Sequence, residues 1–315
     1  MSVLLFQKEG VVMKIFITGG TGFIGTEVVK EAIARGHEVV GLARSDKSAA
    51  LLQGLGATAV HGSLDDLEVI SNAAKASDGV IHLAFTNDFS DFDGAVQKDI
   101  NVITTIGEAL IGSDKPFVNT SGTLTVQNLG RPATEQDFSE DQTGRAQSEA
   151  LSLSFAKQGV RATAVRLAPT VHDVGRQGFG TIFAQMAARQ GKTGYVAQGT
   201  NVWPSVHRKD AAKLFVDALE TGTAGQVYNA VAEEGVSFKA IIQVIADAMH
   251  LPVNHFTDDE ADTYFGWFAQ TATTDDPTSS VWTQQALDWH PIETDLLSDM
   301  RTFLANPDNI AQLKK

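Results

Sequence analysis

The chain reads Lys-Ile-Phe-Ile-Thr-Gly-Gly-Thr-Gly-Phe-Ile-Gly over residues 14–25, an apolar run followed at once by a glycine-rich turn. The run over 14–18 predicts a buried β-strand. Between Phe23 and Arg35 the apolar residues recur at helical spacing, and Gly36 ends the pattern. A strand that passes through a tight turn into a helix is the opening unit of a parallel α/β sheet, so this stretch decides the fold class.

The glycines of the turn follow the spacing G-x-x-G-x-x-G. Gly19 permits the tight turn, Gly22 lets a diphosphate approach the backbone, and Gly25 lets the helix pack close to the strand. The phosphates would face unpaired amides at the positive end of the helix. An ordinary glycine-rich loop is the alternative, but the correct flanks favour dinucleotide binding. The predicted cofactor contacts of this turn are Gly19, Thr21, Gly22, Phe23, Ile24 and Gly25.

The end of the second predicted strand, over residues 37–43, selects between NAD and NADP. An acidic residue there binds the ribose 2′-hydroxyl of NAD, whereas an arginine accommodates the 2′-phosphate of NADP. Arg44 and Ser45 follow the strand, so we predict that they bind NADP and that NAD is less favoured. A solvated Arg44 is the alternative, and Asp46 argues against NADP unless it caps the next helix.

Further apolar runs alternate with helical patterns through the first half of the chain. This alternation predicts an α/β fold with a doubly wound parallel (Rossmann) sheet, helices on both faces and a smaller C-terminal substrate lobe. The remaining strands are expected over 57–61, 79–84, 117–120 and 162–167, and the long helices over 94–111 and 144–157.

The pattern loosens after Pro169, which predicts a second lobe, with substrate in the cleft between the two. The polar stretch 271–280 is the most linker-like segment. We expect an N-terminal extension over 1–12 (with Met13 a possible alternative start), an NAD(P)-binding domain over 13–169 that 200–230 rejoins, and a substrate lobe and tail over 170–199 and 231–315.

The composition excludes several classes of function. Lys and Arg number 24 and Asp and Glu 38, so the net charge is −14, which disfavours nucleic acid and anionic membranes as partners. The chain has no cysteine, which excludes disulfides and thiolate sites and fits a reducing cytoplasm. The eight histidines show no metal-binding spacing, so no metal is expected. No apolar run approaches the roughly 18 residues of a transmembrane helix, and residues 1–10 do not resemble a signal peptide.

Ordered motifs over nearly the whole chain resemble the short-chain dehydrogenases/reductases, and among them an atypical branch of the extended type called the NAD-dependent epimerase/dehydratase family. The matching stretches are TGGTGFIG at 18–25, DGVIHLA at 78–84, Asn101-Val102 followed by Thr104-Thr105, FVNTSG at 117–122, VRLAP at 165–169, VHRKD at 206–210 and LDWHP at 287–291.

The resemblance implies roles for residues after three of the strands. Leu83 and Ala84 would pass along the cofactor, and Pro169 would lead to the nicotinamide pocket. Ser121 would be the active-site serine that holds a substrate carbonyl oxygen. The alternative for Ser121 is a serine that bonds its own loop.

The family's chemistry also uses a tyrosine and a lysine four residues apart on a helix, and here the sequence departs from the pattern. The tyrosine position falls on Asp141 and the lysine position on Arg145. Arg145 would hold the nicotinamide ribose, or would pair with Glu149 on the helix surface. An ionised aspartate donates no proton at neutral pH, so the usual general acid is missing. His172, expected in a loop at the edge of the pocket, is the predicted replacement, although a surface histidine is the alternative.

Two hypotheses of function follow. The first is an NADP-dependent oxidoreductase that acts on a small carbonyl, hydroxyl or sugar-like substrate, with Ser121, Arg145 and His172 at the catalytic centre. The second is a module that binds NADP(H) without chemistry and reports redox state to a partner, which the missing tyrosine motivates. The expected partner is a small-molecule substrate, with a homodimer possible.

Overall fold

The computed structural model describes residues 11–86 and 91–314. Most of the predicted N-terminal extension, residues 1–10, lies outside them. Seven parallel strands form the main sheet in the order β10-β6-β5-β4-β1-β2-β3. These strands are β1 (Lys14–Thr18), β2 (Glu38–Ala43), β3 (Thr58–His61), β4 (Gly79–His82), β5 (Pro116–Gly122), β6 (Arg161–Leu167) and β10 (Val227–Ala230). The predicted Rossmann sheet is confirmed.

Helices cover both faces of this sheet because its strands are apolar on both sides. One face packs against α1 (Gly25–Ala34), α2 (Asp46–Gly54) and α7 (Arg208–Thr221), and the other against α3 (Leu67–Lys75), α4 (Phe92–Leu110) and α5 (Arg145–Ser154). Residues such as Ile15 and Val118 fill the first interface, and Phe16 and Phe117, one position along each strand, fill the second.

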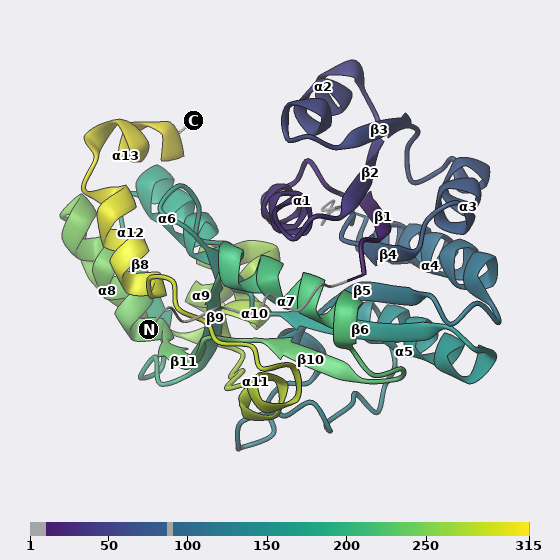
Figure 1. The fold of residues 1–315 in the computed structure, drawn as a ribbon. Helices are drawn as coiled ribbons and strands as arrows, with labels where there is room; N and C mark the ends of the chain where they lie inside the picture. The colour runs from purple at the N-terminus through teal and green to yellow at the C-terminus, as the bar shows by residue number, and fades with distance from the viewer. Residues whose placement is uncertain (1–10, 87–90, 315) are drawn as a thin grey trace, which may run out of the picture.

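A second lobe lies beside the carboxyl ends of the main strands. Its helices α6 (Phe179–Gln190), α8 (Phe238–Met249), α12 (Leu296–Leu304) and α13 (Pro307–Leu313) stand apart from α1 to α5 in Figure 1. A separate aromatic core around Phe183, Trp203 and Phe268 holds the lobe together. Its other elements are η3 (Gly266–Phe268) and the short helices α9 (Asp258–Phe265), α10 (Ala269–Thr273) and α11 (Val281–Leu287).

Two small sheets complete the fold. One contains β7 (Thr170–His172), β9 (Val202–His207) and β11 (Glu233–Ser237), and the other pairs β8 (Thr193–Val196) with β12 (Val253–Phe256). Of the stretch 200–230, β10 and α7 pack with the main sheet, whereas β9 lies in the three-stranded sheet. β10 pairs with β6 at the edge of the main sheet, whereas β9 pairs with β11 and β7.

Candidate functional site

The glycine turn that follows β1 has the geometry of a phosphate cradle. Gly19 has a φ of +73°, and a Cβ there would lie 2.7 Å from the amide nitrogen of Ala84. A Cβ on Gly25 would lie 2.0 Å from the carbonyl oxygen of Gly19, so this glycine permits close packing against the turn itself. A Cβ on Gly22 would meet only the Gly19 carbonyl, at 3.2 Å, within 4 Å. The outer side of the turn is therefore open to a ligand.

The start of α1 is suited to an anion. The N-terminal end of α1 carries partial positive charge, adjoins the turn and has no side-chain cap. Within its first turn, the amides of Thr26 and Glu27 donate to the backbone carbonyls of Gly22 and Ile24. Two cations lie beside Phe23 of the turn, with the guanidinium of Arg208 4.8 Å and that of Arg176 5.5 Å from the ring centroid. Arg208 is already paired with Asp173 at 2.6 Å. The residues of this turn thus fit the diphosphate of a dinucleotide.

The polar side chains at the junction of β1 and β4 form a continuous network. The chain order reverses between these two strands, and ligands of open parallel sheets bind at such a switch point. Thr18 Oγ1 lies 2.6 Å from His82 Nδ1, and His82 Nε2 lies 3.1 Å from Asp99 Oδ1. Arg145 then donates to Asp99 Oδ2 at 2.9 Å and to the carbonyl oxygen of Thr120.

This network sets the charge of Asp99 and the position of Arg145. Burial alone would raise the pKa of Asp99, but the hydrogen bond with His82 and the charge of Arg145 outweigh it and hold that pKa below its usual value. The guanidinium of Arg145 also lies 4.3 Å from the centroid of the Phe85 ring. Arg145 is therefore a fixed cation at the carboxyl edge of the sheet, on the face covered by α4 and α5.

The predicted pairing of Arg145 with Glu149 does not occur. Glu149 instead accepts two hydrogen bonds from Arg166 of β6, at 2.8 and 2.5 Å, and both side chains are buried. Four residues separate Arg145 from Glu149 on α5, but Arg145 turns toward Asp99 on α4. Each arginine therefore pairs with a buried carboxylate on a neighbouring element, Arg145 with Asp99 of α4 and Arg166 with Glu149 of α5.

The side chain of Ser121 has unused hydrogen-bonding capacity, as have those of Asn119 on the same strand and Ser148 on α5. Ser121 lies in β5, one residue before the strand ends, and is only 3% exposed. In the part of the chain that the structure describes, its Oγ has no hydrogen-bond partner. A buried hydroxyl without a partner is costly, which suits a group that binds a ligand oxygen.

Asp141 stands where the family resemblance places the catalytic tyrosine on a helix, but it lies outside that helix. The helix α5 begins only at Arg145, and Asp141 is exposed in the loop before it. The three tyrosines lie elsewhere: Tyr195 contacts His255, Tyr228 accepts from the Thr223 amide, and Tyr264 donates to the Lys192 carbonyl. The four-residue spacing therefore does not place an acid beside Arg145.

His172 lies in the strand β7 and is 1% exposed, where a loop was expected. Its Nδ1 lies 2.7 Å from Asp299 Oδ2 of α12. His207, which caps α7 through its Nδ1, packs edge-on against the His172 ring, and burial together with the charge of His172 lowers the pKa of His207. The geometry thus ties His172 to the second lobe, and its role as proton donor stays a prediction.

The other predicted cofactor contacts lie at the same carboxyl edge. Leu83 and Ala84 follow β4, and their amides donate to the carbonyl and hydroxyl of Thr18. Pro169 follows β6 and accepts from Phe179 through its carbonyl. The sheet therefore brings together backbone stretches that follow β1, β4 and β6.

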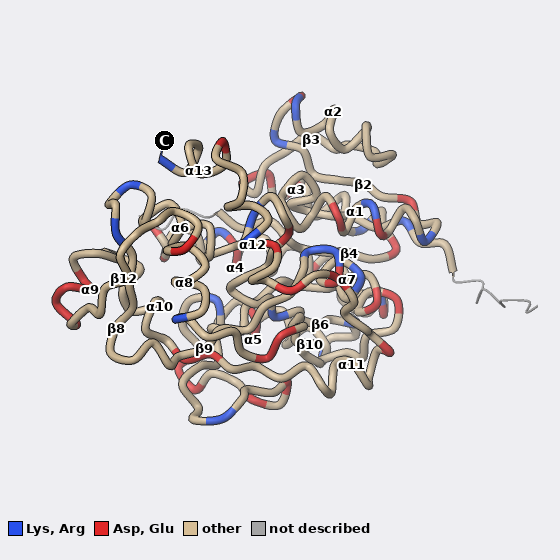
Figure 2. Tube along the Cα trace, turned by 90° about the vertical axis from the view of Figure 1, so that its left-hand side faces the viewer, with Lys and Arg blue, Asp and Glu red and all other residues tan. Residues whose placement is uncertain are grey.

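The turn after β2 carries exposed basic residues. Arg44 and Lys47 are exposed, and Figure 2 shows the blue of Lys and Arg near the start of α2. Ser45 caps α2 by accepting a hydrogen bond from the Ser48 amide, so Asp46 is a first-turn residue of the helix and not its cap. The positive helix end and the cations of Arg44 and Lys47 suit a phosphate group, whereas Asp46, which is not the cap, argues against one.

Sequence reasoning missed four residues at this edge. His82 and Asp99 complete the network, and Thr123 and Asp276 form a second buried pair just beyond β5. The signal for His82 was present, because it ends a strand whose carboxyl edge faces the turn. No spacing could connect Thr123 with Asp276, which lie 153 residues apart.

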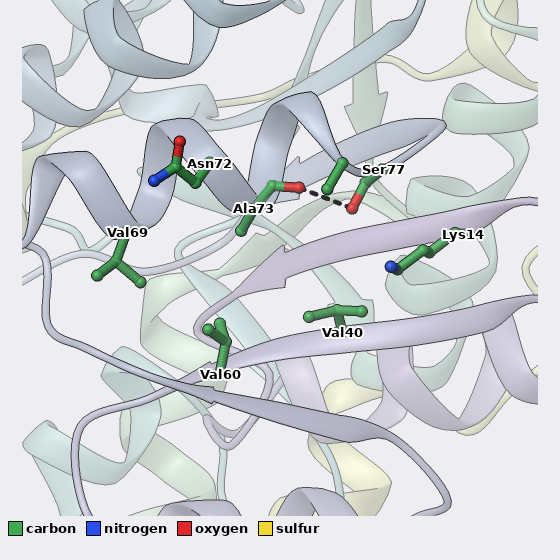
Figure 3. A pocket seen from close by; sticks show the side chains of 8 residues that line it. Lys14, Val40, Val60, Val69, Asn72, Ala73 and Ser77 are labelled. Atoms are coloured by element: carbon green, nitrogen blue, oxygen red, sulfur yellow. Dashed lines mark hydrogen bonds between the residues drawn. The ribbon is translucent and has the colours of Figure 1, made fainter.

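A separate cleft of about 310 Å³ lies between α3 and the adjoining strands β1, β2 and β3. Val69, Asn72 and Ala73 of α3 line this cleft together with Val40 and Val60 of the strands, and Figure 3 shows Val69 above Val60. None of the lining residues belongs to the glycine turn or to the polar network.

Within the described residues, no helix is long and apolar enough to cross a membrane, and no group of three or more acidic or histidine side chains could hold a metal.

The strand order, the glycine turn and the polar edge together define a dinucleotide-binding protein of the Rossmann class. The model of the NAD dependent epimerase/dehydratase family matches residues 15–230. The chain belongs to this family, whose members bind NAD(P) and include oxidoreductases. The resemblance inferred from the motifs is confirmed.

Similar proteins extend over most of the chain. An uncharacterized protein of Schizosaccharomyces pombe is 43% identical over 91% of this chain and 98% of its own length. The 2-alkyl-3-oxoalkanoate reductase of Stenotrophomonas maltophilia is 28% identical over 76% of this chain and 77% of its own. The structure of UDP-glucuronic acid 4-epimerase from Bacillus cereus in complex with NAD superposes with a TM-score of 0.74 at 19% identity, covering 96% of this chain and 100% of that one.

Proposed function

We propose that the protein is an NADP-dependent oxidoreductase of the cytoplasm that acts on a small carbonyl, hydroxyl or sugar-like substrate. The observation that carries this proposal is the unpartnered, buried Oγ of Ser121 at the carboxyl end of β5, on the same edge as the open glycine turn. A hydroxyl so placed donates a hydrogen bond to a substrate oxygen held near the cofactor.

The cofactor would be held by three groups of residues. The glycine turn from Gly19 to Gly25 would bind the diphosphate, with Arg176 beside it. Arg44 and Ser45 would bind the 2′-phosphate, and Arg145 would position the nicotinamide ribose. A bound nicotinamide dinucleotide supplies or accepts a hydride. The chain's own residues then orient the substrate and exclude water, since Ser121 and Thr120 are buried.

The preference for NADP is tested by calorimetric titration of the wild-type chain with NADPH and with NADH. Tighter binding of NADPH is expected. Arg44→Ala should weaken NADPH binding about tenfold and leave NADH binding unchanged, because this side chain would contact the cofactor only through the 2′-phosphate. Arg189→Ala, an exposed arginine of α6, is the matched control. Equal or tighter binding of NADH would end the NADP assignment.

The reaction is tested by following nicotinamide absorbance with NADPH and a panel of carbonyl compounds. The panel should include 3-oxoalkanoates, because the Stenotrophomonas maltophilia relative is named a 2-alkyl-3-oxoalkanoate reductase. Turnover of at least one carbonyl, lost in Ser121→Ala, is expected.

The absence of a tyrosine beside Arg145 favours a second candidate, a non-catalytic module that senses NADP(H). Tight NADPH binding without turnover of any carbonyl would select this candidate.

A further inference from the structure

The segment from Thr274 to Ser280, linker-like in composition, is packed into the protein. The amide of Asp276 donates to the Val202 carbonyl at 2.9 Å, and that of Thr278 donates to the Glu234 carbonyl at 3.0 Å. The Ser279 amide also donates to Ala133, at 2.8 Å. The side chain of Asp275 also holds the segment, because its Oδ1 accepts a hydrogen bond from the Val202 amide at 2.9 Å. These contacts anchor the segment independently of the Asp276 side chain.

The side chain of Asp276 is nevertheless a buried carboxyl. The residue is 1% exposed, and no ion pair reaches it from the described residues. Its Oδ2 lies 2.6 Å from Thr123 Oγ1, and its Oδ1 lies 3.4 Å from Thr278 Oγ1. Placing a carboxylate here without a cation costs free energy, so the neutral, protonated form is favoured.

Burial shifts the pKa of the Asp276 carboxyl toward neutral pH. Burial raises the pKa of Asp276 to about 7, and the negative charge of Asp275 acts in the same direction. The hydroxyls of Thr123 and Thr278 and the charge of Arg166 oppose this rise but do not cancel it. A general acid works best with such a pKa, because it is protonated and still a good donor.

Thr123 and Ser121 emerge on the same side of the chain at the end of β5. Gly122 between them is extended, with φ −143° and ψ 151°, and side chains two residues apart in an extended chain share a face. Arg166 is the register partner of Ser121 on β6, and its positive charge lowers the pKa of Asp276. Arg166 is neutralised by Glu149 and cannot give up a proton. The hydroxyl of Thr123 and the carboxyl of Asp276 behind it are able to transfer one.

We propose that Asp276 supplies a proton, through the hydroxyl of Thr123, to the oxygen of a substrate carbonyl held at Ser121. The inference rests on the proposed reductase function and assigns the acid that the missing tyrosine leaves open. In the reduction, a hydride from the reduced nicotinamide forms the new C–H bond and the C=O π pair moves to oxygen. The oxygen takes the Thr123 hydroxyl proton, and Thr123 regains a proton from Asp276. The products are the alcohol, the oxidised nicotinamide and the Asp276 carboxylate.

The first experiment detects the stored proton in the full chain without any substrate. Infrared spectra are recorded against pH for the wild type and for Asp276→Asn, which keeps the shape of the side chain and cannot titrate. We expect a protonated-carboxyl C=O band that disappears with a midpoint of about 7 and is absent from the variant. An identical titration in both proteins would overturn the inference.

The second experiment follows the pH dependence of carbonyl reduction with NADPH. Wild-type turnover should fall as pH rises through about 7, because the acid loses its proton. Asp276→Asn should lower turnover by roughly 10²-fold and remove this dependence, with NADPH binding unchanged. Thr123→Ser, which keeps the hydroxyl, should retain turnover, whereas Thr123→Val should lose it.

The controls separate the failure of this inference from that of the proposed function. Asp288→Asn removes a carboxyl whose side chain is 96% exposed and should leave turnover unchanged. If the wild type reduces carbonyls and Asp276→Asn matches it in rate and pH profile, the inference alone is wrong. A wild-type chain that binds NADPH but reduces no carbonyl overturns the reductase function, and with it the role of Asp276.

Discussion

Arg145 Nη1 lies 2.9 Å from the buried Oδ2 of Asp99, so the first residue of α5 neutralises a carboxylate in the middle of α4. This contact links the two helices that cover one face of the sheet. It also holds the guanidinium at the edge where the cofactor is proposed to bind. Stability and ligand binding are therefore both expected to depend on Arg145.

Arg145→Ala should lower the free energy of unfolding by roughly 3 kcal/mol, because Asp99 then keeps a buried charge without its cation. Urea denaturation measures this loss. Adding Asp99→Asn should recover part of it, since the uncompensated charge is removed. The control Arg189→Ala should stay within about 0.5 kcal/mol of the wild type. Equal stability of Arg145→Ala and Arg189→Ala would contradict the importance of the pair.

Gly25→Ala should weaken NADPH binding at least about tenfold, or about 1.4 kcal/mol. The added methyl group would lie 2.0 Å from the Gly19 carbonyl oxygen, which forces the turn to open. Calorimetric titration with NADPH measures the effect. Gly54→Ala is the matched control, because a Cβ at the end of α2 meets nothing within 4 Å. Unchanged binding in both variants would show that the turn does not hold the cofactor.

His172→Gln should reduce the free energy of unfolding by roughly 2–4 kcal/mol and leave NADPH binding unchanged. His172 Nδ1 is engaged by the buried carboxylate of Asp299, and removing one partner of such a pair is strongly destabilising. Thermal and urea unfolding measure the loss, with His290→Gln, a 70% exposed histidine, as the control. A variant as stable as the wild type but without carbonyl turnover would instead support His172 as the proton donor.

Asp276→Asn should change how stability depends on pH. Burial raises the pKa of Asp276 from 3.8 to about 7, so between these values the folded chain keeps a proton that the unfolded chain has lost. The contribution of Asp276 to wild-type stability therefore falls as pH rises across this window, by at most roughly 4 kcal/mol, and is level above it. Because the variant lacks this loss, its stability relative to the wild type should increase from about pH 4 to about pH 7.

Urea unfolding of both proteins across this pH range tests the prediction. Asp288→Asn should run parallel to the wild type, because its carboxyl is exposed. A constant difference between Asp276→Asn and the wild type would mean that the Asp276 carboxyl is already ionised throughout.

The local parts of the fold could be predicted because their causes are local. The turn from Gly19 to Gly25 needs glycine wherever a Cβ would strike backbone, and this requirement appears as a fixed spacing in the sequence. The strand over Lys14–Thr18 and five others of the main sheet were predicted from apolar runs. The ends of parallel strands meet at one edge, so Arg44, Ala84 and Ser121 could be assigned to that edge before their contacts were known.

The sequence by itself determined the family, the parallel sheet and the edge that carries the candidate site. Only the tertiary structure decided that Arg145 pairs with Asp99 and not Glu149, and that Asp276 lies against Thr123. These contacts join segments 46 and 153 residues apart, and such pairs leave no periodic signal in the chain. The proton affinity of Asp276 likewise depends on burial, which arises only when the second lobe packs against the end of β5.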